Sequence, residues 1–198
     1  MVVEEAMPRA DGPRSDAVDD PEPELAVVPA TEPTAEPITA ETDLAPVDRF
    51  FYALSSAADH GLLWLLLGAT RAARKGDPAI VLRFGALLSA ESLLTNGVIK
   101  LAFRRVRPQD HFTHEAELPY GMRRPITSSF PSGHAATAFM AAGLLSKGTR
   151  LAPAYYTLAA LVAYSRVHVR MHHPADVAGG AALGIALGAV ARRFVKLT

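Results

Sequence analysis

The stretch PSGHAATAFMAAGLLS, residues 131–146, joins a short polar motif to an apolar run. Ser132 is a favourable helix N-cap, and Gly133 lets a ligand approach the backbone closely. The free N–H groups of a first helical turn, together with the helix dipole, can hold an anion such as phosphate. The stretch therefore predicts a helix that starts near Ser132, either as a plain capped helix or as one that presents its N-terminus to a phosphate group.

Four further apolar runs flank this one, and together they predict an all-α, polytopic transmembrane helical bundle of about five spans. The runs cover about residues 53–70, 79–100, 135–146, 152–165 and 174–191. A bilayer core requires roughly 20 apolar residues, so the third and fourth runs reach across only if their polar ends extend the helices. A soluble bundle is the alternative. We favour the membrane because the first and fifth runs lack a polar face, and because the four glycines between residues 179 and 188 suit close helix packing in lipid.

The charge of the chain is strongly asymmetric. Its 20 basic and 20 acidic residues balance overall, but residues 1–48 contain 13 acidic and two basic residues, a net charge of −11 that leaves +11 on residues 49–198. The first segment also has eight of the 15 prolines and no aromatic residue. We therefore expect a disordered acidic tail over residues 1–48, without the features of a signal peptide, and one membrane domain over residues 49–198.

Residues 50–60 predict an additional helix at the membrane interface, ahead of the first span. Asp59 and His60 are unfavourable within a membrane segment. The alternative for these two residues is a polar layer between helices.

The alternation of the spans places the polar clusters on one face of the membrane domain. That face receives Lys100 and Arg107 after the second span, residues 132–134 before the third, Arg166 after the fourth, and His172 with Asp176 at the start of the fifth. The loop over residues 109–130 is expected to cover the same face. Both faces are rich in basic residues. We assign some basic residues of the motif face to phosphate binding and leave them out of the charge comparison. The opposite face then has more basic residues, so the positive-inside rule favours a motif face on the outside.

The clusters contain the groups needed to remove a phosphate. Lys100, Arg107 and Arg166 offer an ammonium and two guanidinium groups, which suit a tetrahedral oxyanion. Any one of them alone is better explained by lipid headgroups or snorkelling, which is the interpretation we keep for Arg104 and Arg105. The imidazolium of His134 is suited to protonating a leaving oxygen.

Pro174 fits the first turn of the last helix, which places His172 just before that helix and Asp176 inside its first turn. A carboxylate there can accept the Nδ1 hydrogen of an imidazole and leave Nε2 free to attack phosphorus. Alternatively, Asp176 interacts only with the helix dipole. His168, His172 and His173 raise the question of a metal site, but no thiolate or second carboxylate accompanies them, and we expect no metal.

These three clusters, in residue type, spacing and order, resemble the three-part signature of the type 2 phosphatidic acid phosphatase family. The resemblance covers roughly residues 50–195. It implies a membrane phosphatase that needs neither metal nor cofactor. In that family pattern His172 is the nucleophile that forms a phospho-histidine, Asp176 orients it, and His134 is the general acid. The phosphate-binding positions are Lys100, Arg107, Ser132, Gly133 and Arg166.

The function expected on this basis is hydrolysis of a lipid phosphate monoester or diphosphate. Candidate substrates are phosphatidic acid, phosphatidylglycerol phosphate, an isoprenoid diphosphate and a prenyl-phospho-sugar phosphate. The alternatives are a lipid phosphotransferase that uses the same intermediate, and a noncatalytic membrane scaffold. We expect a bacterial inner-membrane protein with an outward-facing site and membrane lipids, not nucleic acid, as partners. The oligomeric state and the role of the tail stay open.

Overall fold

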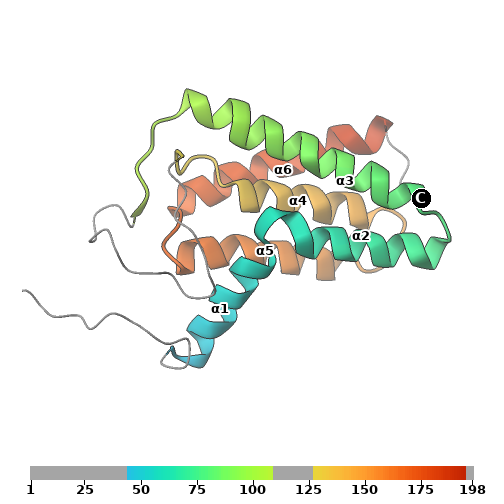
Figure 1. The fold of residues 1–198 in the computed structure, drawn as a ribbon, viewed down its shortest axis with the longest axis horizontal. Coiled ribbons are helices and arrows are strands. Elements are labelled where there is room, and N and C mark those ends of the chain that lie inside the picture. Colours follow the sequence, from blue (N-terminus) through green and yellow to red (C-terminus); the bar gives the residue numbers. More distant parts are fainter. Residues whose placement is uncertain (1–43, 109–126, 195–198) are drawn as a thin grey trace, which may run out of the picture. The chain divides into compact units, whose positions relative to one another are not determined.

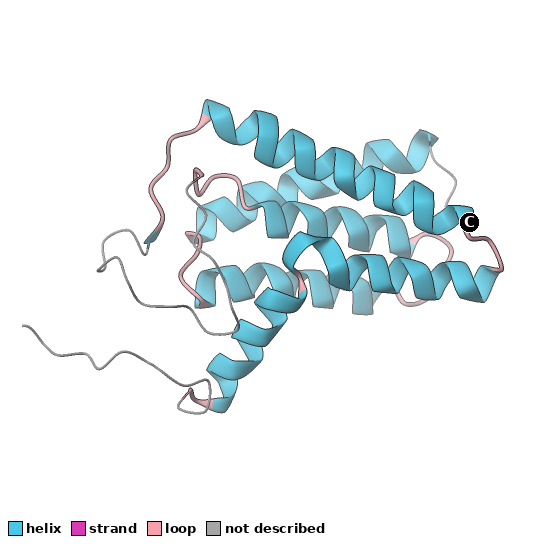
Figure 2. Cartoon of the chain, viewed as in Figure 1, coloured by secondary structure: helices cyan, strands magenta, loops and turns pink. Residues whose placement is uncertain are grey.

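The computed structural model describes residues 44–108 and 127–194, and these residues form helices joined by turns, with no strand among them (Figure 2). The α-helices are α1 (Pro46–Ala57), α2 (Leu62–Lys75), α3 (Ala79–Ser92), α4 (Gly133–Ser146), α5 (Ala152–His168) and α6 (Pro174–Phe194). Helix α3 continues through a π-helical segment, Leu93–Val98, and a 3-10 turn, Ile99–Ala102. The all-helical prediction is confirmed.

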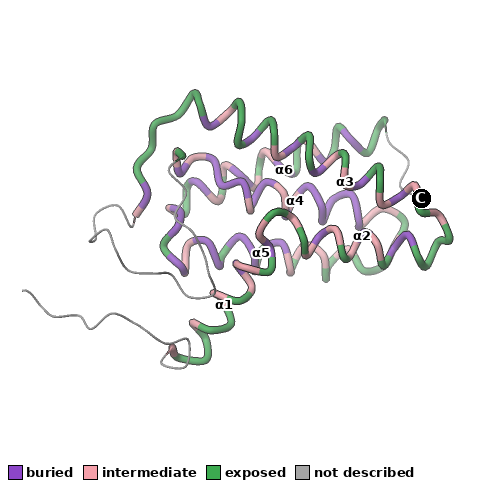
Figure 3. Tube along the Cα trace, viewed as in Figure 1, coloured by how far each residue is buried: buried purple, intermediate pink, exposed green. Residues whose placement is uncertain are grey.

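Helices α2 to α6 lie alongside one another, whereas α1 leaves the bundle at an angle (Figure 1). Helix α4 lies in the middle and contacts α2, α3, α5 and α6. Ten of its 14 residues are buried, so protein rather than lipid surrounds most of this helix (Figure 3). Its N-terminal end is therefore also enclosed by the bundle.

The contact between α4 and α6 depends on glycine. A Cβ atom added to Gly180 would lie 2.3 Å from the carbonyl oxygen of Ser132, and one added to Gly184 would lie 2.1 Å from that of Ala136. Backbone atoms do not move aside as a flexible side chain does, so these positions require glycine. The close packing expected of the glycines in the last span is confirmed at these two positions.

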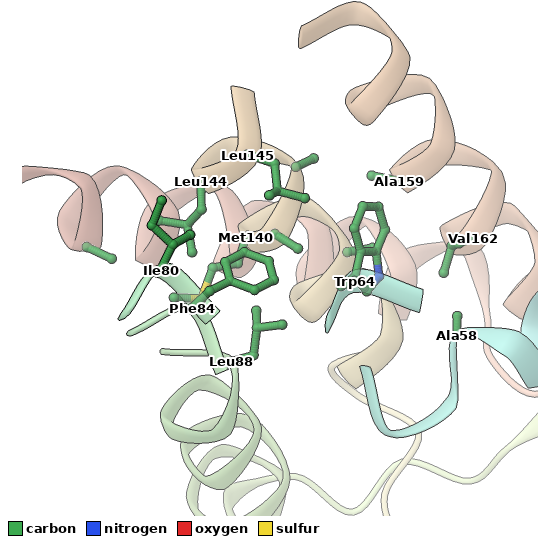
Figure 4. Packing of buried hydrophobic residues seen from close by; sticks show 14 of the residues in the cluster. Ala58, Trp64, Ile80, Phe84, Leu88, Met140, Leu144, Leu145, Ala159 and Val162 are labelled. Carbon is green, nitrogen blue, oxygen red and sulfur yellow. The ribbon is translucent and has the colours of Figure 1, made fainter. Parts of the chain in front are cut away.

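Large side chains fill the space between α4 and the helices on its other sides. The buried cluster includes Trp64 from α2, Ile80, Phe84 and Leu88 from α3, Met140, Leu144 and Leu145 from α4, and Ala159 and Val162 from α5 (Figure 4). Half of the residues of α4 are alanine or glycine, so these bulky side chains can approach its backbone closely. Dense packing of this kind is what stabilises helix association in lipid.

Two helices among the described residues are long and apolar enough to span a membrane. They are Ala79–Ala102, with 24 residues, and Pro174–Phe194, with 21. A third candidate span results if α1 and the following segment, Asp59–Lys75, are counted as one span with a 58° bend. Helices α4 and α5 have only 14 and 17 residues. Length and composition thus support two or three of the five predicted spans, and the short third and fourth runs remain short helices.

Helix α1 begins at Pro46 and packs against α5, where the rings of Phe51 and Tyr164 lie 5.1 Å apart. Residues 46–48, which the sequence assigned to the tail, form the first turn of this helix. The rest of the predicted tail up to residue 43, and loop residues 109–126, lie outside the described residues. The additional helix expected over residues 50–60 is present as α1 and a short 3-10 turn, Asp59–Gly61.

The bend after α1 comes from two consecutive residues in the left-handed region. His60 has φ 54° and Gly61 has φ 73°. Glycine adopts this conformation readily, but a residue with a Cβ adopts it at an energetic cost. The bend redirects the chain from α1 into α2 and leaves Asp59 at the corner between them.

Candidate active site

A cavity of about 680 Å³ lies at the end of the bundle where α4 begins. Six of the eight site residues predicted from the sequence line it: Lys100, Arg107, Gly133, His134, Arg166 and His172. Segments far apart in the chain thus meet at one place, as the alternation of the helices predicted. The other two, Ser132 and Asp176, are completely buried and do not line the cavity.

Three cationic side chains are buried in the wall of this cavity. The exposed fraction is 8% for Lys100, 3% for Arg107 and 4% for Arg166. The Nε of Arg166 is buried without a hydrogen-bond partner among the described residues. Buried charges are costly unless an opposite charge or hydrogen-bonding groups compensate them. The cavity is therefore electrostatically suited to an anion.

Arg107 is held by backbone carbonyl groups from two other segments. Its Nη1 donates to the carbonyl oxygen of Met171 at 2.8 Å, and its Nη2 to that of Ser128 at 3.3 Å. The same Nη1 lies 3.4 Å from Nε2 of His172. Arg166 is anchored from another side, by donation to the hydroxyl oxygen of Ser55 in α1. The guanidinium groups are thus fixed before any ligand binds.

The start of α4 combines the two roles that its sequence left open. Ser132 is the N-cap, and its hydroxyl oxygen accepts from the backbone N–H of Ala135 at 3.5 Å. Gly133 lines the cavity, and a Cβ atom added there would lie 2.8 Å from Oδ1 of Asn96. The Ser132 side chain therefore caps the helix, while the backbone at Gly133 faces the cavity.

The expected hydrogen bond between His172 and Asp176 is replaced by another one. Nδ1 of His172 lies 2.7 Å from the carbonyl oxygen of Ser129, to which it can donate, and 3.8 Å from Oδ2 of Asp176. Oδ2 of Asp176 accepts from the backbone N–H of His173 at 2.8 Å, and its Oδ1 pairs with Nη1 of Arg105 at 2.9 Å. Asp176 thus caps the start of its own helix and also pairs with Arg105, so it does more than interact with the helix dipole. Donation from Nδ1 to Ser129 still leaves Nε2 as the nitrogen with a lone pair.

Burial lowers the pKa of His172, and the positive charges of Arg107, Arg166 and Lys100 lower it further. The imidazole is therefore neutral at physiological pH. A neutral imidazole has the lone pair that a nucleophile needs.

The other cavity histidine, His134, has a partner that the sequence did not assign to the site. Its Nε2 lies 2.7 Å from Oδ1 of Asp59, which also lines the cavity. Asp59 belongs to the polar layer that was one of two interpretations of residues 59 and 60. A second residue misplaced by sequence reasoning is Arg105, which pairs with Asp176 instead of facing only lipid headgroups.

The three histidines considered as metal ligands each contact other groups of the protein. His168 pairs with Asp48 of α1 at 2.7 Å, and His173 contacts Asp176 at 3.3 Å. His172 bonds to Ser129. His172 and His173 thus both lie near Oδ2 of Asp176, at 3.8 and 3.3 Å, whereas His168 has a separate partner in α1.

Residues 79–197 match the model of the PAP2 superfamily. The chain therefore belongs to the PAP2 superfamily, and with its apolar helical bundle it is a phosphatase of the integral membrane type.

Similar proteins agree with this assignment. The decaprenylphosphoryl-5-phosphoribose phosphatase of Mycobacterium tuberculosis is 35% identical over 140 residues, which cover 69% of this chain and 74% of that protein. Among solved structures, the phosphatidylglycerolphosphate phosphatase of Bacillus subtilis matches 77% of this chain and 79% of its own, with a TM-score of 0.57 and 24% identity. LpxE of Aquifex aeolicus matches 78% of this chain and 90% of its own, with a TM-score of 0.56 and 27% identity. The predicted membrane bundle of the phosphatidic acid phosphatase type is confirmed.

Proposed function

We propose that this protein hydrolyses the phosphate monoester or diphosphate of a membrane lipid through a phospho-histidine intermediate. The observation that carries the proposal is the set of three buried cations, Lys100, Arg107 and Arg166, around a cavity that also receives two imidazoles. Among the described lining residues one carboxylate, Asp59, faces these three cations, and a phosphate dianion supplies the remaining negative charge. In this proposal the phosphorus atom lies between the imidazoles of His134 and His172, where both can act on it.

In the first step, Nε2 of His172 attacks phosphorus and the bond to the leaving oxygen breaks. The imidazolium of His134 gives its proton to that oxygen, so the lipid leaves as an alcohol or a monophosphate. In the second step, neutral His134 takes a proton from water, whose oxygen attacks the phospho-histidine and releases inorganic phosphate. Lys100, Arg107, Arg166 and the backbone N–H at Gly133 stabilise the oxygens of the transferring group in both steps.

The roles of Ser132 and Asp176 in this proposal are indirect. Ser132 caps α4 and thereby fixes the N–H groups that face the phosphate. Asp176 holds the turn that carries His172, through the backbone N–H of His173. The chain's own cations neutralise the phosphate in this scheme, so we propose that catalysis needs no metal ion.

The substrate class follows from the other wall of the cavity. Leu65, Leu88 and Leu93 line it beside the polar groups, and they belong to α2 and to the long apolar helix of residues 79–102. This wall suits a lipid chain whose end stays in the membrane. Among the lipids considered from the sequence, we propose a prenyl-phospho-sugar phosphate, because the mycobacterial relative is named for a decaprenylphosphoryl-phosphoribose substrate.

We place this protein in the bacterial inner membrane with the cavity on the outer face. The support is the charge of the opposite loops, which include Arg74, Lys75, Lys147 and Arg150. In the same proposal, the catalytic domain begins with α1 at Pro46, three residues before the boundary predicted from the sequence, and the residues before it form an acidic tail.

The test is phosphate release by detergent-purified protein from a panel of lipid phosphates, in the presence of EDTA. Wild-type protein should release phosphate, and His172→Ala should lose activity to background. His168→Ala is the matched control, because His168 pairs with Asp48 and does not line the cavity. Substantial activity in His172→Ala would contradict the nucleophile assignment. Release that appears only when a lipid or sugar alcohol is added would favour the phosphotransferase.

A further inference from the structure

Asp59 is the one carboxylate among the residues described as lining the cavity. It lies at the bend between α1 and α2, outside the segments that supplied the predicted site residues. Its Oδ1 lies 2.7 Å from Nε2 of His134, and the exposed fractions of the two side chains are 36% and 20%. An aspartate and a histidine thus form a pair at the edge of the cavity.

The local backbone gives Asp59 an unfavourable position as a surface residue. It comes directly after Ala58, the C-cap of α1, close to the helix end whose partial charge is negative and repels a carboxylate. The next two residues, His60 and Gly61, both have positive φ. The groups that stabilise the carboxylate include His134, through a hydrogen bond across the cavity edge, and the positive charge of Arg166 in α5.

His134 faces charges from three other elements. Burial is the largest effect and lowers the pKa of the imidazole. Arg166 in α5 and Lys100 in the 3-10 turn after α3 lower it further, whereas Asp59 raises it, and the net direction is downward. A general acid must carry its proton when the leaving oxygen departs. The phosphate of a bound substrate compensates the two cations, and Asp59 acts directly on the imidazolium.

We propose that Asp59 is a positioning residue for His134, an inference that rests on the general-acid role proposed above. Its carboxylate holds Nε2–H, fixes the orientation of the ring and stabilises the imidazolium. Nδ1 is then the nitrogen that gives its proton to the leaving oxygen. In the second step the same nitrogen takes a proton from water, while Asp59 keeps its hydrogen bond to Nε2.

The experiment compares kcat/KM for two micellar substrates that differ in leaving group, a long-chain nitrophenyl phosphate and a long-chain alkyl phosphate. A nitrophenolate leaves without protonation, whereas an alkoxide requires an acid. Asp59→Asn should lower kcat/KM for the alkyl substrate about 10- to 100-fold, part of the 10²–10⁴-fold that general acids contribute. It should lower kcat/KM for the nitrophenyl substrate less than about threefold. The ratio of the two values does not depend on the folded fraction of a preparation, so partial unfolding cannot imitate the result.

The chain offers a matched control in Asp48→Asn. Asp48 and His168 also lie 2.7 Å apart, with exposed fractions of 38% and 22%, but they do not line the cavity. Asp48→Asn should leave the alkyl-to-nitrophenyl ratio unchanged. The same selective loss in this variant would overturn the proposal, because it would assign the effect to the anchoring of α1.

A double variant tests whether Asp59 acts through His134. In a His134→Ala background, Asp59→Asn should cause little further loss on the alkyl substrate, since residues that act as a unit are not additive. Additive losses would overturn the proposal. If His134→Ala is selective for the alkyl substrate and Asp59→Asn is not, only the role of Asp59 fails. If His134→Ala lowers both substrates equally, the general-acid role fails and the role of Asp59 fails with it.

Discussion

The carbonyl oxygen of Ser129, 43 residues before His172 in the chain, lies 2.7 Å from the Nδ1 that the sequence assigned to Asp176. A spacing of four residues correctly brought His172 and Asp176 into the same turn, but helix starts attract carboxylates to their own N–H groups. Asp176 is engaged in this way and also by Arg105. Local spacing therefore predicted residues that the structure brings together, but not every hydrogen bond between them.

The lowered pKa of His172 leads to a prediction about pH. A histidine with an ordinary pKa near 6.5 becomes protonated as the pH falls through that value and loses its lone pair. His172 should stay neutral there, so kcat/KM for a nitrophenyl phosphate should not fall between pH 7 and about pH 5.5 when it is calculated for the substrate dianion. This substrate is chosen because its leaving group needs no acid.

The measurement is a pH profile of kcat/KM at constant ionic strength, with the pKa of the substrate phosphate determined separately. A decline with an apparent pKa near 6.5 would contradict a neutral, buried nucleophile. His168→Ala serves as the control, since loss of a histidine outside the cavity should leave the profile unchanged.

Other residues of the site show the same limit of sequence reasoning. Lys100, Arg107, His134 and Arg166 could be predicted because each belongs to a compact motif next to an apolar run. Asp59 has no such motif, and its role depends on a bend that brings it to a helix 75 residues later in the chain. The sequence did show that the Asp59 carboxylate lies next to a predicted membrane span. Such a position indicates that the carboxylate has a polar partner, but it does not identify that partner.

At the scale of helices, the sequence predicted where several of them begin. Pro174 starts α6 and Ser132 caps α4, as their residue types indicated. It did not predict the π-helical and 3-10 continuation of α3. Asn96 and Gly97 lie in that segment, but an Asn-Gly pair within an apolar run does not by itself distinguish a π-helical segment from a turn or an α-helix. The glycines of α6 were recognised as packing residues, but only the structure identifies α4 as their partner.

The α4–α6 contact predicts that Gly184→Ala destabilises the bundle. The added Cβ would lie 2.1 Å from a backbone carbonyl oxygen, so the helices must separate. Overpacking of this kind costs about 1–3 kcal/mol. Thermal unfolding in detergent should show a clearly lower Tm than that of wild type.

Gly85→Ala is the control for this stability measurement. A Cβ atom there would lie 3.6 Å from a side-chain atom of Leu65, an ordinary contact distance. Because alanine favours a helix over glycine by about 1 kcal/mol, the Tm should be equal or higher. Equal Tm values for Gly184→Ala and wild type would show that α4 and α6 are not as close as described.

For the whole molecule, the buried cations predict that anions stabilise the fold. Lys100, Arg107 and Arg166 line one cavity, and their positive charges oppose one another when no anion is bound. A ligand that binds only the folded state stabilises it by about 2.7 kcal/mol at 100 times its Kd. Inorganic phosphate or vanadate should therefore raise the Tm.

The comparison uses chloride at the same ionic strength, because screening alone also reduces repulsion between charges. Phosphate should raise the Tm beyond chloride, and Arg166→Gln should reduce that difference. A rise that is identical for the two anions would indicate screening without a binding site.

The hairpin of α4 and α5 affects how the topology of such a chain is counted. Both helices are shorter than the flanking spans, and only five residues, 147–151, join them. A count based on apolar length omits both helices. If α4 and α5 both cross the membrane, their omission does not change the sides predicted for the two chain ends, but it places the connection that carries Lys147 and Arg150 on the opposite side. For this chain, a reporter placed between α4 and α5 is therefore more informative about topology than one fused to either terminus.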